Sequence, residues 1–188
     1  MKDKGDEKVN ILLRVLIVDD SDDDAKLMIR QLHKGGYDPK WERVETPEDM
    51  ETALDREQWD VILCDYKMPR FSAPAALKLV QDKNIDIPFI IVSGAIGENT
   101  AVTAMKSGAH DYLMKDNLAK LVVAIEREIR EAKMRQEKKK TEELLKAKQE
   151  EAMKIPQGNL PPGAFVKQEK SATSNKKEVK VAEPASKK

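Results

Sequence analysis

Short runs of apolar residues recur along the first part of the chain, and each run ends at a polar or charged residue. Continuous apolar runs of about four to eight residues are typical of strands that a parallel sheet buries on both faces. A weaker run, more polar than the others, follows the first one. The sequence therefore predicts strands at Leu12–Val18, Lys40–Val44, Val61–Cys64, Phe89–Val92 and Tyr112–Met114.

Segments with apolar residues at helical spacing lie between and after these runs. Several begin with a capping residue or with a proline in the first turn, and several end at glycine. Alternating strands and helices form a parallel sheet with right-handed crossovers and helices on both faces. The sequence predicts such an α/β fold, with helices from Ala25 to Leu32, from Pro47, from Pro74 to Val80, from Glu98 to Ser107 and from Leu118 to Ala132.

The last predicted helix continues into a charged segment whose apolar stripe weakens at Gln136. A charged, solvated helix fits this segment better than a coiled coil, because the core positions of a stable coiled coil are apolar. From Ile155 onward, Lys, Ser, Pro and Gly dominate, and such a composition buries too little apolar surface to fold. We expect a flexible N-terminus over 1–10, a domain over 11–130, a charged helical extension over 131–152 and a disordered basic tail over 153–188.

The charges of the chain balance in total but not along its length. There are 34 basic and 34 acidic residues among 188, yet residues 152–188 hold eight Lys and only three Glu. A basic tail of this kind most often serves as a solvated spacer. Weak binding to nucleic acid, a membrane surface or an acidic partner is the alternative interpretation.

Cys64 is the only cysteine, so no disulfide can form within the chain and a reducing compartment fits. It lies in a predicted buried strand, where core packing is the expected role and redox sensing the alternative. No segment has the apolar core of a signal peptide or the run of about 20 apolar residues that spans a bilayer. These features predict a cytoplasmic protein without a membrane segment.

Reactive side chains follow the predicted strands. Asp19 and Asp20 follow the first strand, Asp65 the third, Ser93 the fourth and Lys115 the fifth. Because the carboxyl ends of parallel strands meet at one edge of a sheet, we expect these side chains to converge. Carboxylate oxygens are the ligands that Mg²⁺ prefers, and an ammonium and a hydroxyl can bind phosphoryl oxygens. The sequence therefore predicts a site for Mg²⁺ and a phosphoryl group.

Five aspartates crowd into the six positions 19–24. Their mutual repulsion calls for a compensating cation. Asp22, Asp23 and Asp24 fall in the first turn of a predicted helix, where negative charge favours the positive end of the helix dipole. We therefore expect only Asp19 and Asp20 of this group to contact a metal ion.

Four stretches carry a family resemblance. VLIVDDS, VILCDYKMP, PFIIVSG and GAHDYLMKD resemble the receiver domain of two-component response regulators, in register over about residues 12–130. The resemblance implies a flavodoxin-like, five-stranded parallel sheet of order 2-1-3-4-5. It also implies a stand-alone receiver, similar to those of chemotaxis, with an extended last helix.

The resemblance further implies roles for individual residues. Asp65 is the implied phosphoacceptor, a carboxylate nucleophile that takes a phosphoryl group from a histidine kinase or a phosphotransfer protein. Asp20, Asp65 and the backbone carbonyl of Lys67 are the implied direct ligands of Mg²⁺, and Asp19 acts partly through water.

Three more residues take part in the implied chemistry and switch. Lys115 is expected to pair with the phosphoryl oxygens or with the carboxylate of Asp65. Ser93 is expected to bind the phosphoryl group, and Tyr112 to move inward behind it. Phosphorylation would then change a face around the fourth helix, the fifth strand and the fifth helix, and so switch the binding of a downstream protein partner.

We expect such a chain to assist its own phosphorylation and dephosphorylation rather than to act as an enzyme on other molecules. The short segment after the last helix leaves no room for a DNA-binding domain, so proteins are the expected partners, and a phosphorylation-dependent dimer is one form of output.

Two other functions compete with this hypothesis. The first is a helical scaffold that dimerises through its long helix without phosphorylation. The second is a phosphohydrolase of related topology, which needs a second acid two residues after the nucleophile, where this chain has Lys67.

Two positions flank the expected path of attacking water, Lys67 and Ala95. A long cation at position 67 can shield an acyl phosphate, so we expect a long-lived phosphorylated state. The loop RFSAPAAL lacks the glycine that many receivers carry there, so the resemblance does not predict the path of its backbone.

Overall fold

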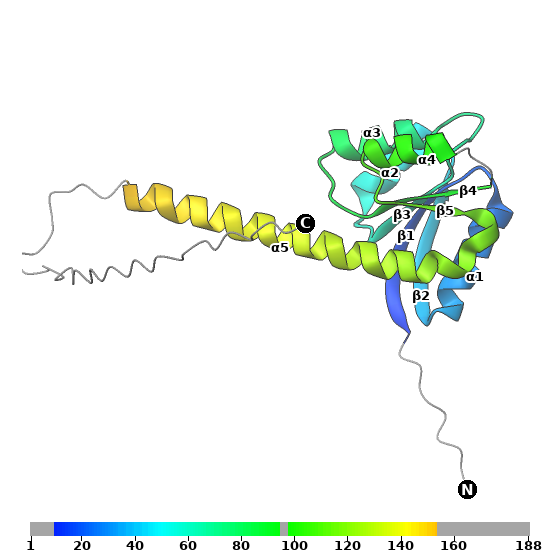
Figure 1. Cartoon of the computed structure of the whole chain (residues 1–188), viewed down its shortest axis with the longest axis horizontal. Coiled ribbons are helices and arrows are strands. Elements are labelled where there is room, and N and C mark those ends of the chain that lie inside the picture. The colour runs from blue at the N-terminus through cyan, green and yellow to red at the C-terminus, as the bar shows by residue number, and fades with distance from the viewer. Residues whose placement is uncertain (1–9, 95–97, 154–188) are drawn as a thin grey trace, which may run out of the picture. The chain divides into compact units, whose positions relative to one another are not determined.

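The computed structural model describes residues 10–94 and 98–153. Within these ranges five parallel strands form one sheet in the order β2-β1-β3-β4-β5, with helices on both faces (Figure 1). The predicted α/β fold and its flavodoxin-like strand order are confirmed. The strands are β1 (Ile11–Val18), β2 (Tyr37–Val44), β3 (Val61–Cys64), β4 (Phe89–Ser93) and β5 (Asp111–Met114).

Each face of the sheet has its own buried core. Met50 of α2, Leu77 of α3 and Phe89 of β4 belong to the core on one face. Met28 of α1 and Ile125 of α5 belong to the core on the other. The helices that supply these side chains are α1 (Asp22–Lys34), α2 (Pro47–Arg56), α3 (Ala73–Asp82), α4 (Glu98–Lys106) and α5 (Leu121–Met153).

Local capping signals explain where the helices begin. The Ser21 hydroxyl accepts a hydrogen bond from the Asp24 backbone N–H at 3.2 Å and so caps α1. Thr46 caps α2 in the same way, with Pro47 as the first helical residue. Both caps supply an acceptor to a backbone donor that has no partner inside the helix. The first cap also fixes the path of the chain immediately after β1.

Several predicted boundaries differ from the structure by one to three residues, and among them the starts of the last helix and of the second strand differ by three. Leu118 does not belong to the last helix, because a 3₁₀ segment at Lys115–Lys120 precedes α5 and Asn117 has non-helical backbone angles (φ −121°, ψ 39°). The chain must turn there from the end of β5 onto the sheet face, although Leu118 itself is buried as its apolar character predicts. Strand β2 begins at Tyr37 rather than Lys40, since it pairs along the whole length of β1.

Helix α5 continues well past residue 130. Ala132 is buried, and two polar side chains beyond it bind the loop before β4. Arg135 Nη2 donates to Asp86 Oδ1 at 3.0 Å, and Gln136 Nε2 donates to the Asp86 backbone carbonyl at 2.7 Å. The predicted flexible N-terminus, apart from Asn10, and the predicted tail, apart from Met153, lie outside the described residues.

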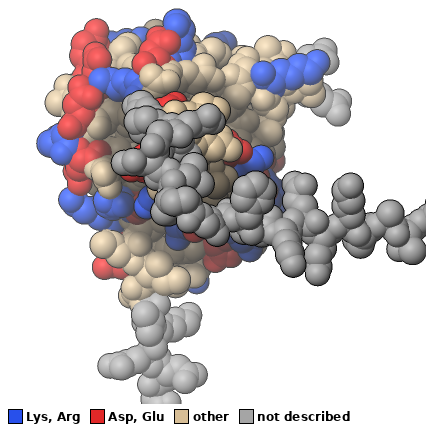
Figure 2. Space-filling model, turned by 90° about the vertical axis from the view of Figure 1, so that its left-hand side faces the viewer, with Lys and Arg blue, Asp and Glu red and all other residues tan. Residues whose placement is uncertain are grey.

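Basic and acidic side chains lie interspersed with uncharged ones on the face shown in Figure 2, among the described residues. Ion pairs at the surface include Lys78–Asp82 and Lys83–Asp55. No helix within the described ranges is long and apolar enough to cross a membrane.

Candidate functional site

Three carboxylates meet at the carboxyl edge of the sheet. Asp19 and Asp20 follow β1, and Asp65 follows the neighbouring strand β3, where its backbone N–H donates to the Val18 carbonyl at 2.8 Å. One oxygen of each carboxylate lies within 4.8 Å of the other two. The structure thus brings Asp65 next to a pair of acids, Asp19 and Asp20, that lies far from it in the sequence.

These carboxylates differ in their access to water. Asp19 is fully buried, Asp65 is 8% exposed, and Asp20 is exposed. Burial raises the pKa of both Asp19 and Asp65, because it disfavours the charged form more than nearby hydrogen bonds and Lys115 favour it. A cation that enters the site would relieve this cost.

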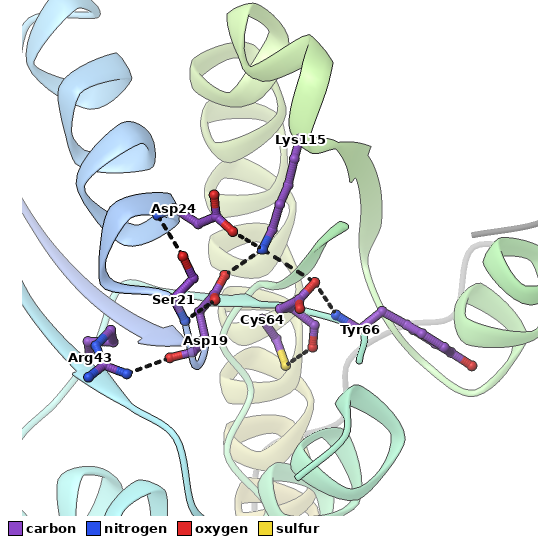
Figure 3. A network of polar contacts seen from close by, with 8 residues as sticks. Asp19, Ser21, Asp24, Arg43, Cys64, Tyr66 and Lys115 are labelled. Atoms are coloured by element: carbon purple, nitrogen blue, oxygen red, sulfur yellow. Dashed lines mark hydrogen bonds and ion pairs between the residues drawn. The ribbon is translucent and has the colours of Figure 1, made fainter. Parts of the chain in front are cut away.

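Lys115 supplies positive charge to the site from the first residue after β5. Its ammonium lies 2.9 Å from Asp19 Oδ2, 2.7 Å from Asp24 Oδ2 and 3.6 Å from Asp65 Oδ1. Figure 3 shows Lys115 pointing toward Asp19 and Asp24. Burial works against the charge of Lys115, but hydrogen bonds to Asp24 and Asp19 outweigh it and raise the pKa to about 12. Lys115 is therefore charged over the whole physiological range.

Backbone and neighbouring groups hold the acids in place. The Asp19 carboxylate accepts the Ser21 N–H at 2.8 Å, and Arg43 of β2 donates to the Asp19 carbonyl at 2.8 Å (Figure 3). Asp65 Oδ1 accepts the Tyr66 N–H at 2.9 Å. The contacts with Ser21 and Tyr66 orient the side chains of Asp19 and Asp65 before any ligand arrives, which is the preorganisation that electrostatic catalysis requires.

Two contacts in this site are absent from the sequence prediction. Asp24 lies in the first turn of α1, as predicted, but its carboxylate also binds Lys115. Arg43 comes from β2 and reaches the backbone at Asp19. The sequence offers one indication of the Asp24 contact. Asp24 lies three residues after a capping serine, and a side chain at that position faces back toward the end of β1.

Of the two expected switch residues, Ser93 lies at the same edge and Tyr112 lies within β5. Ser93 is the last residue of β4 and is 4% exposed. Tyr112 of β5 is half-buried, and its hydroxyl donates to Met114 Sδ at 2.9 Å. Burial raises the pKa of Tyr112, so its hydroxyl keeps its proton.

Lys67 lies in the loop after Asp65. Its backbone forms an isolated antiparallel bridge with Ser72, and its side chain is exposed. Met68 and Phe71 of the same loop are each only 7% exposed. The loop without glycine is therefore closed by a backbone bridge and anchored by two apolar side chains.

The donor set fits a hard divalent cation. The acids Asp19, Asp20 and Asp65 offer only oxygen ligands, which suit Mg²⁺. With Asp24 the group carries four carboxylates against the single ammonium of Lys115. The residual negative charge leaves the site suited to a cation.

Comparisons with known sequences agree with this geometry. A family model described as the response regulator receiver domain matches residues 15–126. The transcriptional regulatory protein ZraR of Escherichia coli is 35% identical over 111 aligned positions, and the match covers 55% of this chain and 24% of ZraR. A chemotaxis protein CheY homolog of Campylobacter jejuni is 28% identical over 105 residues, which make up 55% of this chain and 81% of that protein. The chain thus spans about a quarter of the length of ZraR.

Solved structures show the same fold. The signal receiver domain of a putative Luxo repressor protein from Vibrio parahaemolyticus has a TM-score of 0.59 and 28% sequence identity, over 67% of this chain and 96% of that one. FixJ-N has a TM-score of 0.55 and 29% identity, over 63% of this chain and 94% of that one. The strand order and the clustered acids agree with the family match, and the chain belongs to the response regulator receiver domain family of two-component signalling.

Proposed function

We propose that this chain is a phosphoacceptor response regulator in a two-component phosphorelay. Asp65 takes a phosphoryl group from a histidine kinase or a phosphotransfer protein, and phosphorylation switches the binding of a downstream protein. One observation carries the proposal: oxygens of Asp19, Asp20 and Asp65 lie within 4.8 Å of one another, with the Lys115 ammonium 3.6 Å from Asp65.

The chemistry needs little beyond positioning and charge neutralisation. A carboxylate oxygen of Asp65 attacks phosphorus, the O–P bond forms, and the P–N bond of the donor phosphohistidine breaks with its electron pair going to the imidazole. No general base is required, since the nucleophile is an ionised carboxylate. Lys115 stabilises the negative charge on the phosphoryl oxygens.

Asp19, Asp20, Asp65 and the backbone carbonyl of Lys67 are the groups that would hold Mg²⁺. The ion would neutralise charge on the phosphoryl oxygens when it is bound. The contribution of the protein is to fix these ligands, and hydrogen bonds from the backbone of Ser21 and Tyr66 do so for two of the acids. The chain assists its own phosphorylation and is not an enzyme that acts on other molecules.

The output of the switch is proposed to lie on the face formed by α4, β5 and α5. Ser93 is the last residue of β4, the strand next to β5, and Tyr112 belongs to β5 itself. Several apolar side chains on this face are exposed without covering: Val102 and Met105 of α4 and Val123 of α5. A protein partner that covers this face would bury them. The proposal also includes a cytoplasmic setting, which fits the free and buried thiol of Cys64.

The direct test is intact-mass measurement after incubation with Mg²⁺ and acetyl phosphate. We expect one added phosphoryl group on the wild type and none on Asp65→Asn, which keeps the shape but not the charge of the nucleophile. Asp38→Asn is the matched control, because Asp38 is exposed at the start of β2, away from the acids. Modification of all three proteins, or of none, would contradict the proposal.

A further inference from the structure

Lys115 divides its hydrogen bonds unequally among the carboxylates around it. Its Nζ lies at hydrogen-bond distance from Asp24 (2.7 Å) and Asp19 (2.9 Å), but 3.6 Å from Asp65. The shortest of these contacts is to a residue outside the group of three acids that can share a metal ion. Asp24 therefore binds the Lys115 ammonium without being one of the three acids that could share the cation.

The N-terminus of α1 explains why Asp24 is free to do this. Asp24 is the third residue of a helix capped by Ser21, a position from which an acidic side chain commonly reaches back to the backbone N–H of the cap. Here that N–H already donates to Asp19 Oδ1 at 2.8 Å. The Asp24 carboxylate turns to Lys115 instead, and its side chain is only 33% exposed (Figure 3).

The contact between Asp24 and Lys115 affects Asp65 because of the charges in the site. Four carboxylates, those of Asp19, Asp20, Asp24 and Asp65, face one ammonium. A hydrogen bond between an ammonium and a carboxylate is about twice as strong as one between neutral groups. While Asp24 holds the ammonium, Lys115 cannot draw as closely to Asp65, and the Asp65 oxygens stay available.

We propose that Asp24 is a positioning residue that holds the Lys115 ammonium away from Asp65, and thereby strengthens cation binding while restraining phosphorylation. This inference rests on the proposed function. Loss of the Asp24 charge lets Lys115 turn to Asp65 and Asp19, where it opposes a divalent cation. Loss of the Asp24 charge also lets the ammonium lie nearer to an incoming phosphoryl group. It removes one negative charge that repels an anionic donor as well.

The test compares Asp24→Asn with Asp23→Asn in the full chain. Asp23 is the neighbouring residue in the same turn of α1 and is exposed, so both variants lose one equal charge. We expect Asp24→Asn to weaken Mg²⁺ binding, measured calorimetrically, about threefold to tenfold more than Asp23→Asn does. At saturating Mg²⁺ we expect Asp24→Asn to react faster with acetyl phosphate than Asp23→Asn. A folding defect would weaken Mg²⁺ binding and also slow this reaction. Weaker Mg²⁺ binding together with faster phosphorylation therefore separates a positioning role from a folding defect.

A double-mutant cycle with Lys115→Gln then shows whether the effect passes through the lysine. In the Lys115→Gln background we expect Asp24→Asn to change Mg²⁺ affinity no more than Asp23→Asn does. Equal shifts for the two aspartate variants in the wild-type background, or an Asp24→Asn shift that Lys115→Gln leaves unchanged, would overturn this inference alone. A wild-type protein that binds Mg²⁺ but takes no phosphoryl group would overturn the proposed function, whereas one that binds no Mg²⁺ would overturn both.

Discussion

Asp65 carries its negative charge in a place that disfavours it. Burial is the largest cause of its raised pKa, the neighbouring charges of Asp19 and Asp20 add to it, and Lys115 offsets only part. The folded protein therefore holds a proton on Asp65 more tightly than the unfolded chain does. The negative charge of Asp65 therefore lowers the free energy of unfolding. Perturbed pKa values of this kind are common at functional sites.

The pH dependence of stability follows from that shift. The cost of Asp65 is fully present above its folded pKa and vanishes once the pH falls below its value in the unfolded chain, about 3.9. In metal-free buffer at pH 7 we expect Asp65→Asn to raise the free energy of unfolding, because the variant lacks the buried charge. The advantage over wild type should shrink as the pH falls through the raised pKa.

Chemical denaturation of both proteins in EDTA from pH 7 to pH 4 measures this difference, with Asp38→Asn as the control for loss of an exposed charge. An Asp65→Asn variant that is less stable than wild type at pH 7 would show that Lys115 more than compensates for burial.

The side chain of Lys67 is expected to protect the phosphorylated state. It is exposed, and it lies two residues after Asp65 in a loop that the Lys67–Ser72 bridge closes. We expect Lys67→Ala to speed loss of the phosphoryl group about threefold to tenfold, because a cation that shields the acyl phosphate is removed. Arg70→Ala, at another exposed position of the same loop, is the matched control. Equal decay rates for wild type and Lys67→Ala, followed by intact mass, would refute this role.

The acids and the lysine of the site could be predicted because each follows a strand directly, and a parallel sheet aligns those strand ends. The contacts of Asp24 and Arg43 could not. Asp24 reaches Lys115 across 91 positions of sequence, and Arg43 reaches Asp19 across 24. Such pairings depend on strand order and on which way a helix faces, and neither is encoded by local periodicity.

At the scale of elements, the approach of α1 to α5 depends on a glycine. Gly35 ends α1 with φ −77°, so its backbone angles suit any residue, but a Cβ there would lie 2.6 Å from Cγ2 of Val122. Val122 is β-branched and cannot rotate away freely. Gly35 is therefore required by packing between the helices rather than by backbone conformation.

We expect Gly35→Ala to lower the free energy of unfolding by about 1 kcal/mol or more, because the added methyl group overpacks this contact. In the double variant with Val122→Ala, most of the loss should be recovered, since the clashing methyl groups are gone. Chemical denaturation of the single and double variants measures the coupling. If the losses of unfolding free energy in the two single variants simply add in the double variant, the contact between Gly35 and Val122 does not limit the packing of the two helices.

Strand β3 and the start of α2 could be predicted to the residue, since a continuous apolar run and a Thr-Pro cap mark them. The segment before α5 could not. Leu118 has the spacing of an α-helix residue, but an apolar residue can be buried equally well from the 3₁₀ segment in which it lies. Strand β2 is partly exposed and polar at an edge of the sheet, so pairing with β1 rather than its own pattern sets its beginning.

At the scale of the whole molecule, the uncovered apolar side chains predict an association. Val102, Met105 and Val123 are 48%, 41% and 68% exposed on α4 and α5. We expect the phosphorylated protein to dimerise through this face, and Val123→Arg to remain monomeric when phosphorylated. Leu27→Arg is the control, because Leu27 is an exposed apolar residue of α1. Light scattering after size exclusion measures the mass, and a phosphorylated wild type that stays monomeric would contradict the prediction.

The transfer of a phosphoryl group to Asp65 can be tested at the residue concerned. Borohydride reduces an acyl phosphate to an alcohol, so a phosphorylated aspartate becomes homoserine, which peptide mass spectrometry locates. After reaction with Mg²⁺ and acetyl phosphate, we predict homoserine at Asp65 and aspartate still at positions 19, 20 and 24. Homoserine at one of those three positions, or at none of the four, would contradict the account.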